Sequence, residues 1–391
     1  MKARIMVVGS GWQFTSGISY YTCRLSNELA KEHAVAAVLM RRLVPRQVYP
    51  GRARVGVPVN SALDYAAGIP VYDGVDWHWG GSLLKALRFL REFRPQVVVF
   101  QWWTGAVLHS YNVLAAQARR LGARVVFEFH EVQDTGEVRV PLVRHYVRRG
   151  LPRLLRQCDG FVVHSEFDRK ALHDAYRLPE VPTAVVPHGP YDHHRGVPRP
   201  ARRSGAPIRL LYFGTIRPYK GLEDLVAAFE MLRSRRTRDF RLKVVGETWE
   251  QWDLPLEMIR RSPHADGVQV INRYVDDREV TAAFAQADIV VLPYRRSSSS
   301  GPLHIAMAHG LPTVVTAVGG LVEATRDYAG AVLVEPDDPV ALAEGIVAAT
   351  TLIGRTFADA RSWDDTRQAM RSLLSGFGLV PGAPIAAPAG S

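Results

Sequence analysis

Cysteine is nearly absent from this sequence of 391 residues, which contains only Cys23 and Cys158. Two thiols cannot build a disulfide framework or a structural zinc site, so the composition favours a reducing environment. Long apolar runs are also missing, because no uninterrupted stretch approaches the roughly 18 residues that cross a bilayer. The first residues enter a strand-like run without the apolar core and cleavage site of a secretory signal. We therefore expect a cytoplasmic protein.

Lysine is scarce as well, since only 6 of the 49 basic residues are lysines. The net charge is +11, and residues 1–190 carry +10 of it, with 25 basic against 15 acidic residues. Such an excess suits an anionic lipid surface, a nucleic acid or an acidic ligand, or serves solubility alone. Residues 139–156 interleave arginines with apolar residues, which is compatible with a helix on an anionic bilayer or with an ordinary solvated helix. We expect no nucleic-acid partner and keep peripheral association with the inner membrane face as a hypothesis.

Strand-like apolar runs alternate with helix-period segments along nearly the whole chain, which is typical of parallel α/β architecture. A proline-rich basic stretch interrupts the alternation once. We therefore predict two doubly wound, Rossmann-like domains that face each other across a cleft, with ligands at the carboxyl ends of the strands. The predicted parts are a first domain (1–195), a linker (196–207), a second domain (208–360), a helix crossing back to the first domain (361–375) and a disordered tail (376–391).

The predicted elements are nearly continuous apolar strands, as expected when helices cover both faces of a sheet. The first-half strands are Arg4–Val8, Val35–Met40, Val97–Gln101, Arg124–Phe129 and Gly160–Val163, and the helices include Ile18–Lys31, Ser82–Phe93 and Val107–Leu121. The second-half strands are Ile208–Phe213, Arg241–Val245, Val268–Ile271, Ile289–Leu292 and Thr313–Thr316, and the helices are Leu222–Arg233, Val280–Ala285, Pro302–His309 and Pro339–Thr350.

A glycine-rich turn follows the first predicted strand, as Gly9-Ser10-Gly11-Trp12-Gln13-Phe14, and Gly17 opens the next helix. A dinucleotide fingerprint needs a third glycine where Phe14 stands and an acidic residue about twenty positions later. The second strand ends instead in Met40-Arg41-Arg42, where arginines suit a 2′-phosphate. An NADP-dependent oxidoreductase thus stays an alternative, although the glycines favour a tight turn that brings a ligand to the helix N-terminus.

Two further motifs lie in the second half. The first is Phe213-Gly214-Thr215-Ile216-Arg217-Pro218-Tyr219-Lys220-Gly221, in which two cations stand between a strand and a helix N-terminus and can clamp a diphosphate. The second is Tyr294-Arg295-Arg296-Ser297-Ser298-Ser299-Ser300-Gly301-Pro302, in which Pro302 suits the first position of a helix. Its hydroxyl and N–H groups predict a second anion cradle, or else a flexible loop.

His130 closes a predicted strand and is followed by Glu131. A histidine in this position can hydrogen-bond a substrate hydroxyl, polarise a leaving group or simply pack. His188, His193 and His194 cluster near the linker without acidic or cysteine partners at ligand spacing, so we predict no metal site there. Because no Asp-x-Asp pair suited to a nucleotide-bound cation stands at a strand end, we expect neither a metal nor a cofactor.

These motifs, in this order and spacing, resemble glycosyltransferase family 4, a family of retaining nucleotide-sugar transferases with the GT-B fold. The resemblance runs from Arg4 to about Leu374. In the first half it rests on the glycine-rich loop with Gly17, residues 94–99, the strand that ends in His130, Val162-Val163-His164-Ser165-Glu166-Phe167 and Val186-Pro187-His188-Gly189. In the second half it rests on residues 214–221, Val244-Val245-Gly246-Glu247, residues 287–293 and Val318-Gly319-Gly320-Leu321-Val322-Glu323.

The resemblance implies a metal-independent enzyme that moves a sugar from a nucleotide diphosphosugar to a hydroxyl of a small molecule, natural product or lipid-linked glycan, with retention of anomeric configuration. It implies catalytic roles for His130, Arg217 and Lys220. The implied ligands are Gly11, Gly17, Arg217, Lys220, Ser299, Ser300, Gly301 and Leu303 for the donor diphosphate and sugar, Gly246, Arg273, Tyr274 and Val275 for the nucleobase and ribose, and Trp12, Gln13, Phe14 and Glu131 for the acceptor. A nucleotide-sugar epimerase of the same fold is an alternative.

The sequence departs from the family pattern at the paired glutamates, where Ser297 and Ile305 stand instead. It also has Thr215 in place of the family's arginine, and we expect Arg217 to supply that charge from two positions later. The loss of both carboxylates indicates a subgroup and leaves the donor sugar open. We expect the serine-rich turn to contribute more of the donor binding in compensation.

Overall fold

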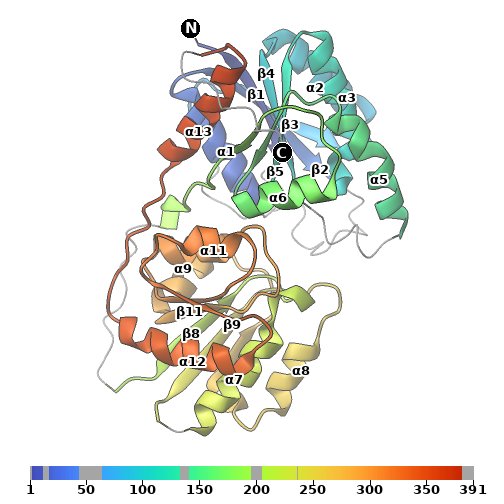
Figure 1. Cartoon of the computed structure of the whole chain (residues 1–391). Coiled ribbons are helices and arrows are strands. Elements are labelled where there is room, and N and C mark those ends of the chain that lie inside the picture. The colour runs from blue at the N-terminus through green and yellow to red at the C-terminus, as the bar shows by residue number, and fades with distance from the viewer. Residues whose placement is uncertain are drawn as a thin grey trace. The chain divides into compact units, whose positions relative to one another are not determined.

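The computed structural model describes residues 2–11, 17–43, 64–132, 141–194, 205–235 and 237–380, with the backbone alone for 141–143. The chain divides into two compact units, of which the first comprises residues 1–189 and 361–391 and the second residues 190–360. Each unit is built on one parallel sheet with helices on both faces (Figure 1). This confirms the predicted pair of Rossmann-like domains.

The sheet of the first unit has, within the described ranges, seven strands in the order β3-β2-β1-β4-β5-β6-β7. The central strands are buried along most of their length because helices exclude water from both faces. The carboxyl ends of parallel strands lie at one edge of such a sheet, and that edge is where its ligands bind. The bounds are β1 Arg4–Ser10, β2 Ala34–Arg42, β3 Val71–Asp76, β4 Val97–Trp102, β5 Arg124–Phe129, β6 Gly160–Val163 and β7 Thr183–Val185.

Figure 1 shows α1 and α13 on one side of this sheet and α2, α3 and α5 on the other. Helix α13 follows the second unit in the sequence but packs in the first, where Thr366 Oγ1 donates a hydrogen bond to the Pro187 carbonyl at 2.9 Å. The tail beyond residue 380 lies outside the described residues. The bounds are α1 Gly17–Ala30, α2 Gly80–Phe93, α3 Leu108–Arg120, α5 Pro141–Leu155, α6 Glu166–Ala175 and α13 Trp363–Gly376.

The second unit repeats the topology of the first six strands, since its described strands follow the order β10-β9-β8-β11-β12-β13 and none corresponds to β7. Helices α7, α8 and α12 lie on one side of the sheet and α9 and α11 on the other (Figure 1). The strands are β8 Ile208–Phe213, β9 Phe240–Val245, β10 Val268–Ile271, β11 Ile289–Leu292, β12 Thr313–Thr316 and β13 Ala331–Val334. The helices are α7 Leu222–Ser234, α8 Leu254–Arg261, α9 Asp277–Gln286, α10 Gly301–Ala308, α11 Gly320–Thr325 and α12 Pro339–Ala349.

The arginine-rich segment expected as an amphipathic helix forms α5, whose apolar side packs into the first unit. Val147, Leu151 and Leu154 are buried in the core, whereas Arg148 and Arg149 are exposed. Within the described part of α5, these apolar side chains are therefore engaged in the core, and the exposed side chains include several arginines and Tyr146. Among the described residues, no helix combines the length and apolar character needed to cross a membrane.

Candidate functional site

The loop between β8 and α7, residues 214–221, carries the two cations that the sequence singled out; we call it the cation loop. Gly246 allows the loop to approach β9, because a Cβ at Gly246 would lie 1.7 Å from the Gly214 carbonyl oxygen. A 3₁₀ turn over Pro218–Lys220 ends at Gly221, whose φ of 60° favours glycine. A Cβ on Gly221 would lie 1.9 Å from the Pro293 carbonyl oxygen, so the loop after β11 lies directly against the cation loop.

Three cations gather around the ring of Tyr219. The guanidinium carbons of Arg217 and Arg296 lie 5.2 and 4.7 Å from its centroid, and Lys220 Nζ lies 5.2 Å from it. Lys220 Nζ is closer still to Tyr294, at 3.6 Å from that centroid. An aromatic face attracts a cation without cancelling its charge. The loops after β8 and β11 thus place three cationic side chains around one aromatic ring.

The guanidinium of Arg217 already has partners within the protein. Its guanidinium forms an ion pair with Glu250 and lies 5.3 Å from the centroid of Trp249. Glu250 has a φ of 63°, a left-handed conformation that is uncommon for a residue with a side chain. An anion that bound Arg217 would therefore compete with the Glu250 carboxylate.

Arg295 joins the loop after β11 to the cation loop. Its guanidinium pairs with Glu223, Asp224 and Asp337. Its Nη1 also donates to the Pro218 carbonyl at 2.9 Å, and its backbone N–H donates to the Tyr219 carbonyl at 2.9 Å. This arginine holds the loop in shape, whereas the neighbouring Arg296 is exposed.

The serine-rich turn satisfies many of its own polar groups. Ser300 is the N-cap of α10, is 2% exposed, and accepts the Leu303 N–H at 3.3 Å. Ser297 Oγ donates to the Ser299 carbonyl at 2.8 Å, and Ser299 Oγ lies 3.3 Å from His304 Nε2. Gly301 begins the helix, and Leu303 and Ile305 are buried. The turn is thus an ordered helix start, and the anion cradle expected there stays a prediction.

The residues expected at the nucleobase follow β9 and β10. Gly246 directly follows β9, and Arg273 follows β10 by two positions. The Arg273 guanidinium binds Glu279 through two contacts of 2.9 and 2.5 Å, so α9 holds it in place. Tyr274 is half-buried and Val275 is buried. Because this segment follows β10, its backbone lies at the same edge of the sheet as the cation loop.

In the first unit, the glycine-rich turn packs tightly against β2. The Gly11 N–H donates to the Met40 carbonyl at 3.2 Å, and Ser19 Oγ donates to the Gly11 carbonyl at 2.8 Å. Gly17 is the first residue of α1. Trp12, Gln13 and Phe14, expected on the acceptor side, lie outside the described residues, and Glu131 is exposed.

The two arginines considered for a 2′-phosphate, Arg41 and Arg42, both lie near the same carboxylate. Arg41 Nη2 lies 2.5 Å from Asp76 Oδ2, and the Asp76 carboxylate is buried. A cofactor phosphate would have to displace this carboxylate.

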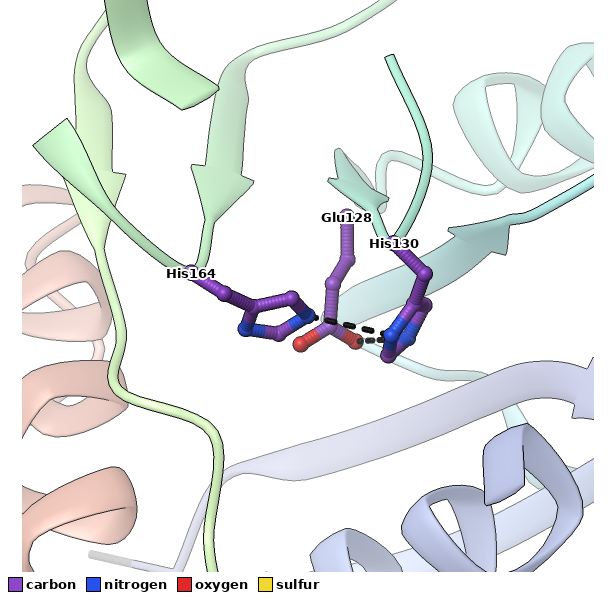
Figure 2. Close-up of side chains that lie close together, drawn as sticks. All are labelled: Glu128, His130 and His164. Atoms are coloured by element: carbon purple, nitrogen blue, oxygen red, sulfur yellow. Dashed lines mark hydrogen bonds and ion pairs between the residues drawn. The ribbon is translucent and has the colours of Figure 1, made fainter. Parts of the chain in front are cut away.

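A histidine stands just beyond each of three neighbouring strands in the first unit. His130 follows β5 directly, His164 follows β6 directly, and His188 lies three positions after β7. Glu128, within β5, completes the group. Figure 2 shows the rings of His130 and His164 and the carboxylate of Glu128 pointing toward one another. We call Glu128, His130 and His164 the Glu–His–His cluster.

The cluster is connected by short contacts in the interior. His164 Nε2 lies 3.1 Å from His130 Nδ1, and Glu128 Oε2 lies 3.9 Å from His130 Nε2. Tyr21 donates its hydroxyl proton to Glu128 Oε1 at 2.7 Å, and Gln101 Nε2 donates to Glu128 Oε2 at 3.0 Å. Glu128 is fully buried and His130 is 7% exposed.

Burial shifts the pKa of every titratable group here toward the neutral form. It raises the pKa of Glu128 to about 7 and lowers the pKa of His164 to about 4. Burial, followed by charge on His164, lowers the pKa of His188 to about 3. The pKa of His130 falls well below 6.5 through burial first and the charges of His164 and His188 second. At neutral pH the imidazoles are therefore uncharged and carry lone pairs.

Sequence reasoning selected His130 but missed its partners Glu128, Tyr21 and Gln101 as site residues, and it gave His164 and His188 no role of their own. The signal was present as a histidine directly after each of two predicted strands, β5 and β6, because adjacent strands bring such residues together. His188 follows β7, a strand that the sequence did not predict. The carboxylate partner was harder to find, since Glu128 lies inside an apolar strand. In the second unit, Arg296 was likewise not selected as a ligand.

Two family models match the chain, one in each half. Residues 15–190 match the model described as Glycosyltransferase Family 4, and residues 207–351 match the model described as Glycosyl transferases group 1. The chain is also similar to the D-inositol 3-phosphate glycosyltransferase of Arthrobacter sp., with 33% identity over 142 residues, 35% of this chain and 34% of the relative. The corresponding protein of Salinispora arenicola is 28% identical over 245 residues, 56% of this chain and 54% of the relative. The chain thus spans about a third to a half of these relatives.

Solved structures share the fold over nearly the full length. Anabaena HepE, crystallised in complex with UDP and glucose, superimposes with a TM-score of 0.65 at 14% identity, covering 95% of this chain and 100% of that one. At this identity the likeness shows the arrangement of elements alone, which is that of GT-B proteins.

Proposed function

Because the chain belongs to glycosyltransferase family 4, we propose that it transfers a sugar from a nucleotide diphosphosugar to an acceptor hydroxyl with retention of configuration. The single observation that carries this proposal is the concentration of Arg217, Lys220 and Arg296 around Tyr219 at the carboxyl edge of the second sheet. A diphosphate leaving group gains negative charge as the glycosidic bond breaks. Preorganised cations there stabilise the transition state more than the ground state.

The donor is proposed to bind the second unit through three features. Lys220 acts as a point charge on the diphosphate, and the planar fork of Arg217 or Arg296 suits two phosphate oxygens at once. The start of α10 adds backbone N–H groups and the positive end of a helix. The segment Arg273–Val275 lies along the same sheet edge and supports the nucleobase through its backbone. This charge is supplied by side chains, so the proposed reaction needs no metal.

The acceptor is proposed to bind the first unit, where His130 and the exposed Glu131 follow β5. No side chain of the described residues stands out as a covalent nucleophile. We therefore favour substitution on one face of the sugar, in which the acceptor oxygen bonds to the anomeric carbon as the diphosphate oxygen leaves. The acceptor proton then passes to the departing phosphate.

The similar proteins suggest the first compounds to test. UDP-glucose is the first donor, since HepE was crystallised with UDP and glucose, and an inositol phosphate is the first acceptor. A donor panel should raise the melting temperature for a matching sugar nucleotide, since only the folded state binds it. With acceptor present, mass spectrometry should detect the glycoside and an equal amount of nucleoside diphosphate.

Product analysis separates this proposal from the epimerase alternative. An epimerase would release an isomerised sugar without an acceptor. Isomerised sugar in acceptor-free reactions, with no glycoside in any acceptor reaction, would overturn the proposal.

A further inference from the structure

The Glu–His–His cluster has the side chains of a transition-metal site. Glu128, His130 and His164 each offer one ligand atom, and these atoms all lie within 4.8 Å of one another. One carboxylate and two imidazoles are a set that binds Zn²⁺ in proteins, whereas Mg²⁺ and Ca²⁺ prefer oxygen ligands throughout. The three side chains converge from two adjacent strand ends (Figure 2).

Hydrogen bonds determine which nitrogen atoms carry protons. His164 Nδ1 lies 2.9 Å from the Val186 carbonyl oxygen, which can only accept, so Nδ1 carries the proton. Neutral His164 then has a lone pair on Nε2, which accepts the Nδ1–H of His130 at 3.1 Å. His130 in turn has its lone pair on Nε2. That atom is buried and has no hydrogen-bond partner.

The unpartnered nitrogen faces a carboxylate across a gap of suitable size. His130 Nε2 lies 3.9 Å from Glu128 Oε2, which is too long for a hydrogen bond. At a tetrahedral angle, two zinc bonds of about 2.0–2.2 Å hold their ligand atoms roughly 3.4 Å apart, so the two atoms need to approach by about 0.5 Å. A cation between these two electron-rich atoms would satisfy both.

The surroundings also have the form of a metal site's outer shell. Tyr21 and Gln101 fix the two oxygens of Glu128, and Gln101 is itself in contact with Thr22 Oγ1 at 2.5 Å. The Val186 carbonyl orients the ring of His164. In metal sites, ligating histidines donate their second N–H to such acceptors and ligating carboxylates accept further hydrogen bonds.

We propose that the Glu–His–His cluster binds one divalent transition-metal ion of the Zn²⁺ class. Glu128 Oε2 and His130 Nε2 are two ligands. His164 is more exposed than the other two residues and supplies Nε2 as the third ligand. To bind the metal, this nitrogen gives up the hydrogen bond that it accepts from the His130 N–H. A water molecule fills the fourth position, as in zinc sites with three protein ligands.

Metal binding at this place has a consequence for the proposed transferase. An ion on His130 would fix its ring away from a substrate, so Zn²⁺ would act as an inhibitor and the transfer itself would stay metal-free. The metal site does not depend on this consequence, because binding is measured directly and without any sugar nucleotide.

The test is a calorimetric titration of the full chain, freed of affinity tag and stripped with EDTA before desalting, with ZnCl₂ at pH 7.5. We expect one Zn²⁺ per chain. His164→Asn keeps an amide N–H for the Val186 carbonyl but removes the ligand atom, so affinity should fall at least 100-fold. Tyr21→Phe removes one hydrogen bond to Glu128 and should weaken binding about tenfold. His173→Asn, an exposed histidine on α6 of the same unit, should leave affinity unchanged.

Co²⁺ provides a second readout, since a tetrahedral site of nitrogen and oxygen ligands gives visible absorption that His164→Asn should abolish. Melting curves of the metal-free variants establish that each is folded. If a variant of a ligand residue is unfolded, Tyr21→Phe provides the test in its place. The proposal is overturned if the wild type binds no Zn²⁺, or if folded His164→Asn or Tyr21→Phe binds it as tightly as the wild type does.

Discussion

The carboxyl edges of the two sheets share the order of six strands but carry different chemistry. In the second unit, Arg217, Lys220 and Arg296 lie against aromatic rings at the edge, and Arg217 is also paired with Glu250. In the first unit, His130 and His164 are drawn into the interior beside Glu128, where burial favours neutral forms. One edge therefore suits an anion and the other suits a cation or a hydroxyl. The fold sets the place of each site, and the side chains set its chemistry.

The largest expected effect on activity concerns the carboxyl edge of the second sheet, where the Lys220 cation can be removed without changing the first sheet. Lys220→Ala should lower kcat/KM about 10²–10³-fold, because a preorganised charge on the leaving group is lost. Lys220→Arg should also lose activity, since a guanidinium has a different shape. The measurement is steady-state kinetics with the donor identified by thermal shift.

Arg260→Ala on α8 is the matched control, because it removes an exposed cation of the same unit away from the cation loop. Wild-type turnover by Lys220→Ala would contradict the diphosphate assignment.

The second prediction concerns the buried histidines and the pH dependence of stability. The pKa of His164 is lowered from 6.5 to about 4 in the folded protein, so the unfolded chain binds its proton first as pH falls. The stability tied to His164 is therefore present above pH 6.5 and lost progressively down to about pH 4. The loss at pH 5 is about 2 kcal/mol.

Glu128 acts in the opposite direction, because its raised pKa makes stability fall as pH rises from 4.5 to about 7. The contribution of His164 is isolated by comparing the pH dependence of stability of the wild type with that of His164→Asn. His164→Asn should lose about 2 kcal/mol less than the wild type between pH 7 and pH 5, as measured by urea unfolding at each pH. Parallel losses in the two proteins would show that His164 is not buried as a neutral group.

A smaller effect is expected at the serine-rich turn. Ser300→Ala removes the N-cap of α10 and should lower the free energy of unfolding by about 1 kcal/mol. Ser299→Ala removes only a contact to His304 and should cost less. If the turn also binds the donor, calorimetry should show weaker donor binding in both variants. Donor affinity equal to wild type in both would limit the turn to a structural role.

The sequence predicted most strands with continuous apolar runs almost to the residue, among them β5, β6, β8 and β12, although it missed β13. It missed β3 because Asp73 and Gly74 interrupt the run, and β7 because that strand has three residues. Helix α6 was missed because most of its residues are polar and only Asp168 and Leu172 are buried. Strands and helices at the edge of a sheet bury less apolar surface, so the hydrophobic periodicity of their sequences is weaker.

The cation loop was predictable because its residues are consecutive, and consecutive residues need no knowledge of the fold. The partners of these residues were not predictable. The ion pair of Arg217 with Glu250 joins two strand ends, and the bond of Tyr21 to Glu128 spans 107 positions. Such contacts depend on strand order and on the rotamers chosen in the interior, which local patterns do not encode.

The most direct test of the account is a calorimetric titration of the full chain with UDP and other nucleoside diphosphates in excess EDTA, with wild type, Lys220→Ala and His164→Asn compared. We expect that one nucleoside diphosphate binds without any metal, that Lys220→Ala weakens binding at least 30-fold, and that His164→Asn leaves it unchanged. Binding that requires Mg²⁺, or that survives Lys220→Ala undiminished, would contradict the assignment of the anion site to the second unit.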